Sequence, residues 1–252
     1  MKEKRIKSKR EYLSRTEIEE RASHMLQYVL PDRGEDPNPP DLKKIVSVMR
    51  SKYNVQFSFS KNLGSLESGE KLLGMFHVNP LTISVCSSMD AWSPDFNRTL
   101  AHELGHLVLH RKMIGNGKYI PKDKPIVDTA QKLRYGETAD LSDLGWVEWQ
   151  ANEFSMCLIL PRKYIQVLVI FAQNKLGINK NLGTMYLDDQ PCNKYDCKRI
   201  VDLIKELSGA RENLLWRRLR FLGILEDHQK HRMRPAFESF DALFETEGEN
   251  QE

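Results

Sequence analysis

The sequence predicts an α+β fold, in which a small, twisted, mainly antiparallel sheet packs on a central helix and a helical subdomain follows. Two segments with apolar residues at helical spacing come first, and three short strand-like segments lie between residues 55 and 86. From residue 93 onward the apolar residues return mostly to helical spacing. The chain has 252 residues, enough for one sizeable core or for a core with a small satellite domain.

The first two elements are predicted helices. Ile18, Ala22, Met25 and Leu26 recur at helical spacing within 15–28, where Thr16 is the expected N-cap. Four prolines lie between residues 31 and 40 and predict a loop. A second helix is expected to begin after a cap at Asp41 and to end near Met49.

Three predicted strands follow these helices. Residues 55–59 alternate between apolar and polar side chains, as a half-buried strand does. Residues 72–78 and 81–86 are two further strands, with a turn expected at Asn79-Pro80.

The clearest helix start in the chain is at Ser93. Serine is a good N-cap, Pro94 suits the first helical position, and Asp95 favours the positive end of the helix dipole. This helix is expected to end near His110. The rest of the chain is predicted as a loop at 111–140, helices at 143–160 and 161–175, a loop at 176–194, and helices at 197–207 and 211–222.

Charge and cysteine content exclude several classes of protein. The net charge is only +3, and four cysteines without framework spacing are not typical of a secreted disulfide protein. The basic residues 2–10 are not followed by the apolar segment of a signal peptide, and no run approaches the roughly 20 apolar residues of a membrane span. We therefore expect no membrane partner and a cytoplasmic location.

The segment His102-Glu103-Leu104-Gly105-His106 carries the chemistry. Histidines at positions i and i+4 of a helix share one face, so two imidazoles can hold one Zn²⁺ ion. Glu103 points about 100° away and is placed to take a proton from water as a general base. The apolar residues around the motif make a chance pair of surface histidines a poorer explanation.

A catalytic zinc usually has a third protein ligand. A third histidine six residues after His106 is excluded, because position 112 is Lys. Glu148 on the next helix is the better candidate, and Asn152 one turn later could orient a ligand imidazole. His110 is expected in the second layer around the metal. Glu153 is expected to point away, at the surface.

Two motif halves together resemble the ImmA/IrrE family of metallopeptidases. They are His-Glu-Leu-Gly-His-x-x-x-His from His102 and Glu-x-x-Ala-Asn-x-Phe-Ser-x-x-Leu-Ile-Leu-Pro from Glu148 to Pro161, and the resemblance extends over roughly 15–225. It implies a gluzincin-like site, with His102, His106 and Glu148 as zinc ligands and Glu103 as the base. The chain departs from the family pattern in its long segment 111–146 and in Ser155, where Ala is usual.

The resemblance also implies a function. Members of the family are zinc endopeptidases that cleave a helix-turn-helix repressor and so derepress genes of the stress or DNA damage response, of mobile elements or of antiphage defence. The alternative is a non-proteolytic, metal-stabilised regulatory or binding module, toxin- or antitoxin-like, with a sensing role for nucleic acid. An intact Glu103 favours the enzyme, because a binding module needs no base there.

Several roles in such a site stay open in the sequence. Tyr119, Tyr135 and His110 are candidate donors to the oxyanion of the reaction. The strand at 81–86 is the expected edge on which an extended peptide adds. Cys86 is a candidate inhibitory thiol at the open zinc position, whereas Cys157 is expected in the core.

The C-terminal part of the chain is basic. Residues 198–234 carry ten Lys or Arg against five acidic residues, and Arg217, Arg218 and Arg220 are candidate contacts to DNA as an activating ligand. The alternative is a basic face that pairs with the acidic tail. The predicted division is a flexible basic arm at 1–14, the zinc metallopeptidase domain at 15–175, a basic helical subdomain at 176–234 and an acidic tail at 235–252. Cys192 and Cys197 have no matching second pair, so no structural zinc site is expected there.

Overall fold

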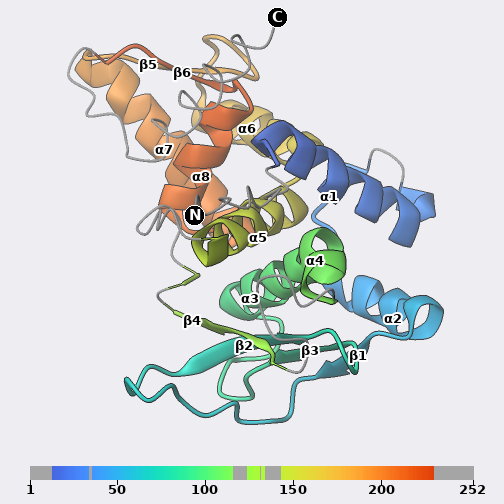
Figure 1. Ribbon diagram of the computed structural model, residues 1–252. Helices are drawn as coiled ribbons and strands as arrows, with labels where there is room; N and C mark the ends of the chain where they lie inside the picture. Colours follow the sequence, from blue (N-terminus) through green and yellow to red (C-terminus); the bar gives the residue numbers. More distant parts are fainter. Residues whose placement is uncertain (1–12, 34–35, 116–123, 131, 134–142, 230–252) are drawn as a thin grey trace, which may run out of the picture.

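The computed structural model describes residues 13–33, 36–115, 124–130, 132–133 and 143–229 (Figure 1). It has the predicted α+β class. The described residues form two hydrophobic cores, one around a four-stranded sheet and one among the C-terminal helices. The predicted arm at 1–14, except Leu13 and Ser14, and the acidic tail at 235–252 lie outside the described residues, as do Tyr119 and Tyr135. The predicted domain boundaries stay a prediction.

The two N-terminal helices are α1 (Arg15–Val29) and α2 (Leu42–Tyr53), with a short 3-10 turn, η1 (Pro31–Arg33), between them. Asp41 caps α2 as predicted, but α2 continues one turn beyond Met49. The predicted cap at Thr16 is wrong. Ser14 caps α1 instead, because its hydroxyl accepts from the backbone of Glu17 while the Glu17 carboxylate accepts from the backbone of Ser14.

The sheet is mixed, with the strand order β1-β3-β2-β4. Its strands are β1 (Gln56–Ser58), β2 (Leu72–His77), β3 (Thr82–Val85) and β4 (Ile126–Thr129). β2 pairs antiparallel with β3 and with β4, whereas β1 pairs parallel with β3. The strand at 81–86 was expected to be the edge for a peptide, but β3 lies inside the sheet. β4 falls within 111–140, where only loop was predicted.

Helix α3 (Pro94–Gly105) lies between the sheet and α5 (Asp143–Ile159), and α1 covers the other side of α5 (Figure 1). Ser93 caps α3 as predicted, by accepting from the backbone of Phe96. The helix continues to the predicted end through a π-helical turn, η2 (His106–His110), followed by the short α4 (Arg111–Gly115). A Cβ on Gly105 would lie 3.0 Å from Cα of Ala151, so glycine permits the close approach of α3 and α5.

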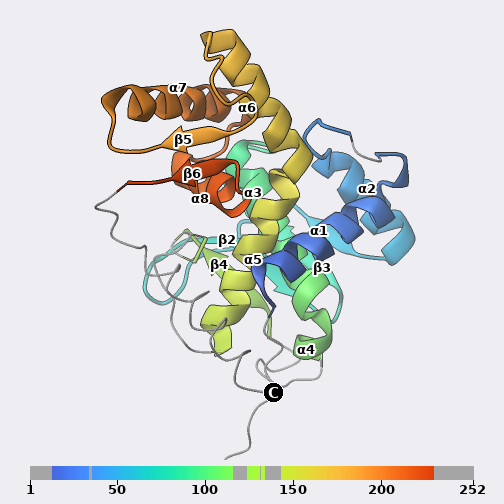
Figure 2. The same cartoon turned by 90° about the horizontal axis from the view of Figure 1, so that it is seen from above.

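The second core joins the end of α5 to the C-terminal elements. These are α6 (Arg162–Leu176), β5 (Met185–Leu187), α7 (Pro191–Ser208), α8 (Glu212–Phe221) and β6 (Leu225–Asp227). β5 and β6 form a two-stranded parallel sheet, so the loop predicted at 176–194 contains a strand and the first turn of α7. Figure 2 shows α5 and α6 crossing the molecule, with α7, α8, β5 and β6 on one side and α1 and α2 on the other.

Within the described part of the chain, none of the helices has by itself the length and apolar character of a membrane span. One pair, Gly145–Ile159 with Arg162–Leu176, satisfies length and composition when taken together, but it is bent by 56° at the break.

Candidate metal centre

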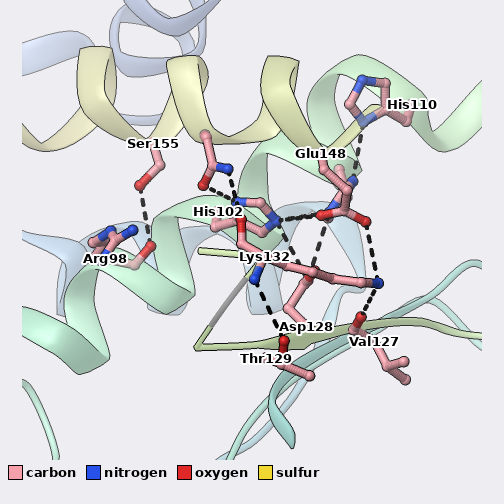
Figure 3. Close-up of polar contacts among 11 residues, drawn as sticks. Arg98, His102, His110, Val127, Asp128, Thr129, Lys132, Glu148 and Ser155 are labelled. Atoms are coloured by element: carbon pink, nitrogen blue, oxygen red, sulfur yellow. Dashed lines mark hydrogen bonds and ion pairs between the residues drawn. The ribbon is translucent and has the colours of Figure 1, made fainter. Parts of the chain in front are cut away.

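Four buried side chains from four elements converge at one point in the first core (Figure 3). His102 comes from α3, His106 from η2, Asp128 from β4 and Glu148 from α5. Each offers one ligand atom, and these atoms all lie within 4.8 Å of one another. The structure thus brings together the three predicted ligands and adds Asp128.

The distances from the two imidazoles to each other and to the two carboxylates are close to the edges of a tetrahedron, and the two carboxylate oxygens lie within 4.8 Å of each other. Nε2 of His102 lies 3.0 Å from Nε2 of His106, and it lies 3.3 Å from Oε2 of Glu148 and 3.4 Å from Oδ2 of Asp128. Nε2 of His106 lies 3.6 Å from the same Asp128 oxygen and 3.7 Å from the same Glu148 oxygen. A tetrahedral ion with bonds of about 2.0–2.1 Å separates its ligand atoms by about 3.3 Å. The four side chains therefore fit a small divalent metal ion.

Outside this group, the described partners of the two carboxylates are few: the carboxyl of Glu103 interacts with Asp128, and the ammonium of Lys132 lies 3.7 Å from Oε1 of Glu148. Both oxygens of Asp128 and Oε1 of Glu148 are buried without a hydrogen bond among the described residues. A buried carboxylate without a partner costs several kcal/mol, roughly, unless a cation neutralises it. A bound divalent ion would satisfy these oxygens.

In the metal-free protein, protonated histidines balance the negative charges of the two carboxylates. Burial lowers the pKa of His102, but the carboxylates of Asp128 and Glu148 outweigh burial and raise it to about 10. Burial likewise raises the pKa of Asp128, and the two imidazoles outweigh it and hold the pKa well below its usual value. Asp128 and Glu148 thus stabilise a positive charge on the imidazoles, and the same negative charges would stabilise a bound metal ion.

A second layer of side chains orients the two imidazoles. Nδ1 of His102 donates to Oδ1 of Asn152 at 2.9 Å, which leaves Nε2 free to bind a metal. Nδ1 of His106 lies 3.1 Å from Nδ1 of His110, whose Nε2 donates to Oε1 of Gln150 at 3.0 Å. Burial and the neighbouring His106 lower the pKa of His110 to about 3, so His110 is neutral. Asn152 and His110 thus lie where the sequence predicted them.

Glu103 lies beside the group without belonging to it. The side chain is fully buried, and neither carboxylate oxygen has a hydrogen bond among the described residues. Burial raises its pKa well above the usual value, and the charges of Asp128 and Glu148 raise it further. Gly74 of β2 makes room for it, because a Cβ there would collide with Oε1 of Glu103. A carboxylate in this setting holds a proton more tightly than an exposed one, as a general base must.

Sequence reasoning missed Asp128. The signal is weak, since Ile126-Val127-Asp128-Thr129 is a single four-residue strand in a segment rich in Lys, Gly and Pro. Two apolar β-branched residues before an acidic residue are the only local indication. The contacts that bring Asp128 to the histidines are made through the pairing of β4 with β2, some fifty residues earlier in the chain.

Cys86 does not belong to the metal group. Its buried thiol lies at the end of β3, 3.3 Å from Oγ of Ser88 and 3.9 Å from Oδ1 of Asn62. The fourth position that the sequence analysis offered to this thiol is held by Asp128. Cys157 is buried in the first core, as expected.

The arginines predicted to contact DNA are engaged inside the fold. Arg218 is fully buried and its guanidinium donates to Oε1 of Glu19 at 2.9 Å, and Arg217 is buried against Glu153. Arg220 donates to Oδ2 of Asp227. Arg217 and Arg218 are therefore buried, and the partners named here for them, Glu153 and Glu19, belong to α5 and α1.

Glu153 was expected at the surface, and this expectation is wrong. Its side chain is only 1% exposed, and its carboxylate lies between Arg217 and Arg15. The side chain points away from the metal group, as predicted, but into the contact between α5, α1 and α8.

The fold and the site define an α+β protein with a buried group of two histidines, an aspartate and a glutamate that could hold a metal ion. The chain matches no protein-family model and no curated protein sequence.

Proposed function

We propose that the protein is a zinc-dependent endopeptidase of the ImmA/IrrE type, with a gluzincin-like site. The observation that carries the proposal is Glu103, a fully buried carboxylate with a raised pKa next to a group of metal-binding side chains. A structural metal site has no use for such a group, whereas a metallopeptidase requires one. Two imidazoles and two carboxylates at tetrahedral spacing suit zinc.

Zinc, when bound, supplies a Lewis acid that polarises a peptide carbonyl and acidifies water. His102, His106 and Glu148 would hold it, and Asn152 fixes the tautomer of His102. Glu103 would take the proton from the attacking water and deliver it to the nitrogen of the leaving amine. Its raised pKa suits both steps, because a strongly acidic carboxylate would accept the proton poorly.

The substrate we propose is a helix-turn-helix repressor, whose cleavage derepresses stress-response, mobile-element or antiphage genes. This choice is supported by the resemblance of the two motif halves, from His102 and from Glu148, to the family.

The test is incubation of the zinc-loaded chain with a helix-turn-helix protein encoded beside it, followed by mass spectrometry of the products. Glu103→Gln keeps the shape of the side chain but removes the base, and we expect the rate of cleavage to fall by about 10²–10⁴-fold. Glu206→Gln on the exposed face of α7 is the matched control and should leave the rate unchanged. Cleavage that survives Glu103→Gln would exclude the proposed mechanism.

Asp128 favours a second candidate. Four protein ligands are typical of a structural zinc site, whereas catalytic sites usually keep one position open. In that case the metal would stabilise a regulatory or binding module, and zinc would raise thermal stability equally in the native chain and in Glu103→Gln while neither cleaves.

A further inference from the structure

Asp128 stands where a working peptidase needs an open position. Its Oδ2 approaches the two Nε2 atoms at 3.4 and 3.6 Å, nearly the same distances as Oε2 of Glu148. Glu148 and Asp128 thus both lie within reach of an ion held by the two imidazoles. An ion bound by all four side chains would have no tetrahedral position left for water or a carbonyl oxygen.

The strand that carries Asp128 also covers the sheet edge nearest to Glu103. β4 pairs antiparallel with β2, so that Met75 lies opposite Val127 and Phe76 opposite Ile126. β2 contacts α3, and its Gly74 abuts the Glu103 carboxylate. Without β4, β2 would be the free edge beside the base, where an extended peptide adds through main-chain hydrogen bonds.

The pairing of β4 with β2 directs Asp128 toward the metal group. Asp128 lies opposite Gly74, and a Cβ on Gly74 would meet the Glu103 carboxylate. Paired residues of neighbouring strands project to the same face of a sheet, so Asp128 lies on the face that meets the active-site helix. The register then shifts between Gly74 and Leu72, where Leu72 lies opposite Thr129.

Lys132 links the end of β4 to the residues of the metal centre. Its ammonium group donates to the carbonyl of Val127 at 2.7 Å and lies 3.7 Å from Oε1 of Glu148, and its own carbonyl accepts from Asn152 (Figure 3). The Lys132 side chain is 40% exposed, so solvent competes for these contacts. This attachment is polar, whereas Ile126 of the same strand is buried in the first core.

We propose that β4 is an internal substrate mimic that closes the centre: its backbone takes the place of a peptide on β2, and Asp128 takes the coordination position that the reaction needs. This inference rests on the proposed peptidase function. The active state is one in which β4 leaves β2 and Asp128 leaves the metal together.

The first experiment asks whether Asp128 closes the metal. The full chain is loaded with one Co²⁺ per molecule, and acetohydroxamate, a small chelator that needs open metal positions, is titrated while the visible Co²⁺ absorption is recorded. Asp128→Asn and Asp128→Ala should bind the chelator at least about tenfold more tightly than the native chain, about 1.4 kcal/mol. Asp90→Asn, an exposed aspartate, is the matched control and should behave as native. Equal affinity in the native chain and both Asp128 variants would overturn the proposal.

The second experiment asks whether β4 holds the place of a peptide. The double variant Met75→Cys/Val127→Cys places two thiols at paired positions of β2 and β4, where oxidation can lock the strands together. A tripeptide hydroxamate should bind the Co²⁺-loaded oxidised form at least about tenfold more weakly than the reduced form. Equal binding by the two forms would contradict the role of β4.

The outcome for the peptidase function is separate. If Asp128→Asn binds the chelator more tightly but cleaves no helix-turn-helix protein, the closure stands and the proposed substrate or activity fails. If the native chain cleaves and binds the chelator as tightly as the variants, the activity stands and the closure fails.

Discussion

Two regions of this protein bury carboxylates, and they neutralise them differently. Where α1, α5 and α8 meet, Glu19 and Glu153 face the guanidinium groups of Arg218 and Arg217. At the metal centre, no Lys or Arg faces Asp128 in the described contacts, and both its oxygens lack hydrogen bonds. In the first region the charges are paired within the chain, whereas the second could be completed by a cation from outside.

The difference lies in the chemistry of the positive partner. A guanidinium keeps its proton at every physiological pH, so the junction of α1, α5 and α8 is permanently paired. An imidazole releases its proton and offers a lone pair instead, so His102 and His106 can exchange a proton for a metal. In this protein, buried carboxylates paired with arginine therefore indicate a structural role, and buried carboxylates beside histidine indicate a candidate metal site.

Removal of the metal should have the largest effect. A ligand that binds only the folded state at about 1,000 times its Kd adds about 4 kcal/mol to the free energy of unfolding. We expect the unfolding temperature to fall when a chelator is added to the zinc-loaded chain, and this difference to vanish in His102→Ala. An unfolding temperature that zinc and chelator leave unchanged would contradict a metal at this position.

Loss of the buried guanidinium of Arg218 should have the second largest effect on stability. Arg218→Met fills a similar volume but leaves the carbonyl of Leu160 without its donor and leaves Glu19 with only the more exposed Arg162. We expect the free energy of unfolding to fall by about 3 kcal/mol, measured by urea denaturation. Arg211→Met breaks an exposed pair with Asp95 and should cost less than about 1 kcal/mol. Zinc affinity should stay the same in both, and a loss of zinc in Arg218→Met would show that the two regions are coupled.

The side chains that orient the imidazoles should affect the affinity for zinc, with little effect on the contact between α1, α5 and α8. Asn152→Ala removes the acceptor that orients His102, and we expect zinc affinity to fall by about 10–100-fold. A competition titration with a coloured chelator measures it. Asn174→Ala, exposed at the end of α6, is the control. An unchanged affinity in Asn152→Ala would mean that the ring is held by packing alone.

Taken per pH unit, the smallest effect is the pH dependence of metal binding. Because the pKa of His102 is raised to about 10 in the metal-free centre, the ring carries a proton at neutral pH that must leave when a metal binds. Zinc affinity should therefore rise with pH, by about tenfold per unit between pH 7 and 9. The same titration at three pH values checks this, and a flat profile would show that His102 is already neutral.

Local signals in the sequence predicted the elements that depend on nearby residues. Ser93, Pro94 and Asp95 indicate the start of α3, and the structure has it there. Histidines one turn apart meet because helix geometry alone brings them together. Asp41 caps α2 for the same local reason.

Features that depend on distant contacts could not be predicted. Asp128 reaches the histidines only because a four-residue strand pairs with β2. Arg217 and Arg218 have the pattern of a basic surface, and their burial follows from carboxylates 64 and 199 residues away. A pattern of charges shows that partners are needed, and only the fold decides which carboxylates they are.

The π-helical turn His106–His110 has a consequence for how the active helix tolerates changes of length. In chain length, a π-turn amounts to an α-helix with one residue inserted. Deleting one residue between 107 and 109 would let the helix close with regular α-helical spacing, and the later residues would keep their directions because the wide turn had absorbed the extra residue. His102 and Glu103 would stay in place, and the contact of His110 with Gln150 would be kept. The helix thus carries one residue of spare length in the turn that follows its metal-binding histidines.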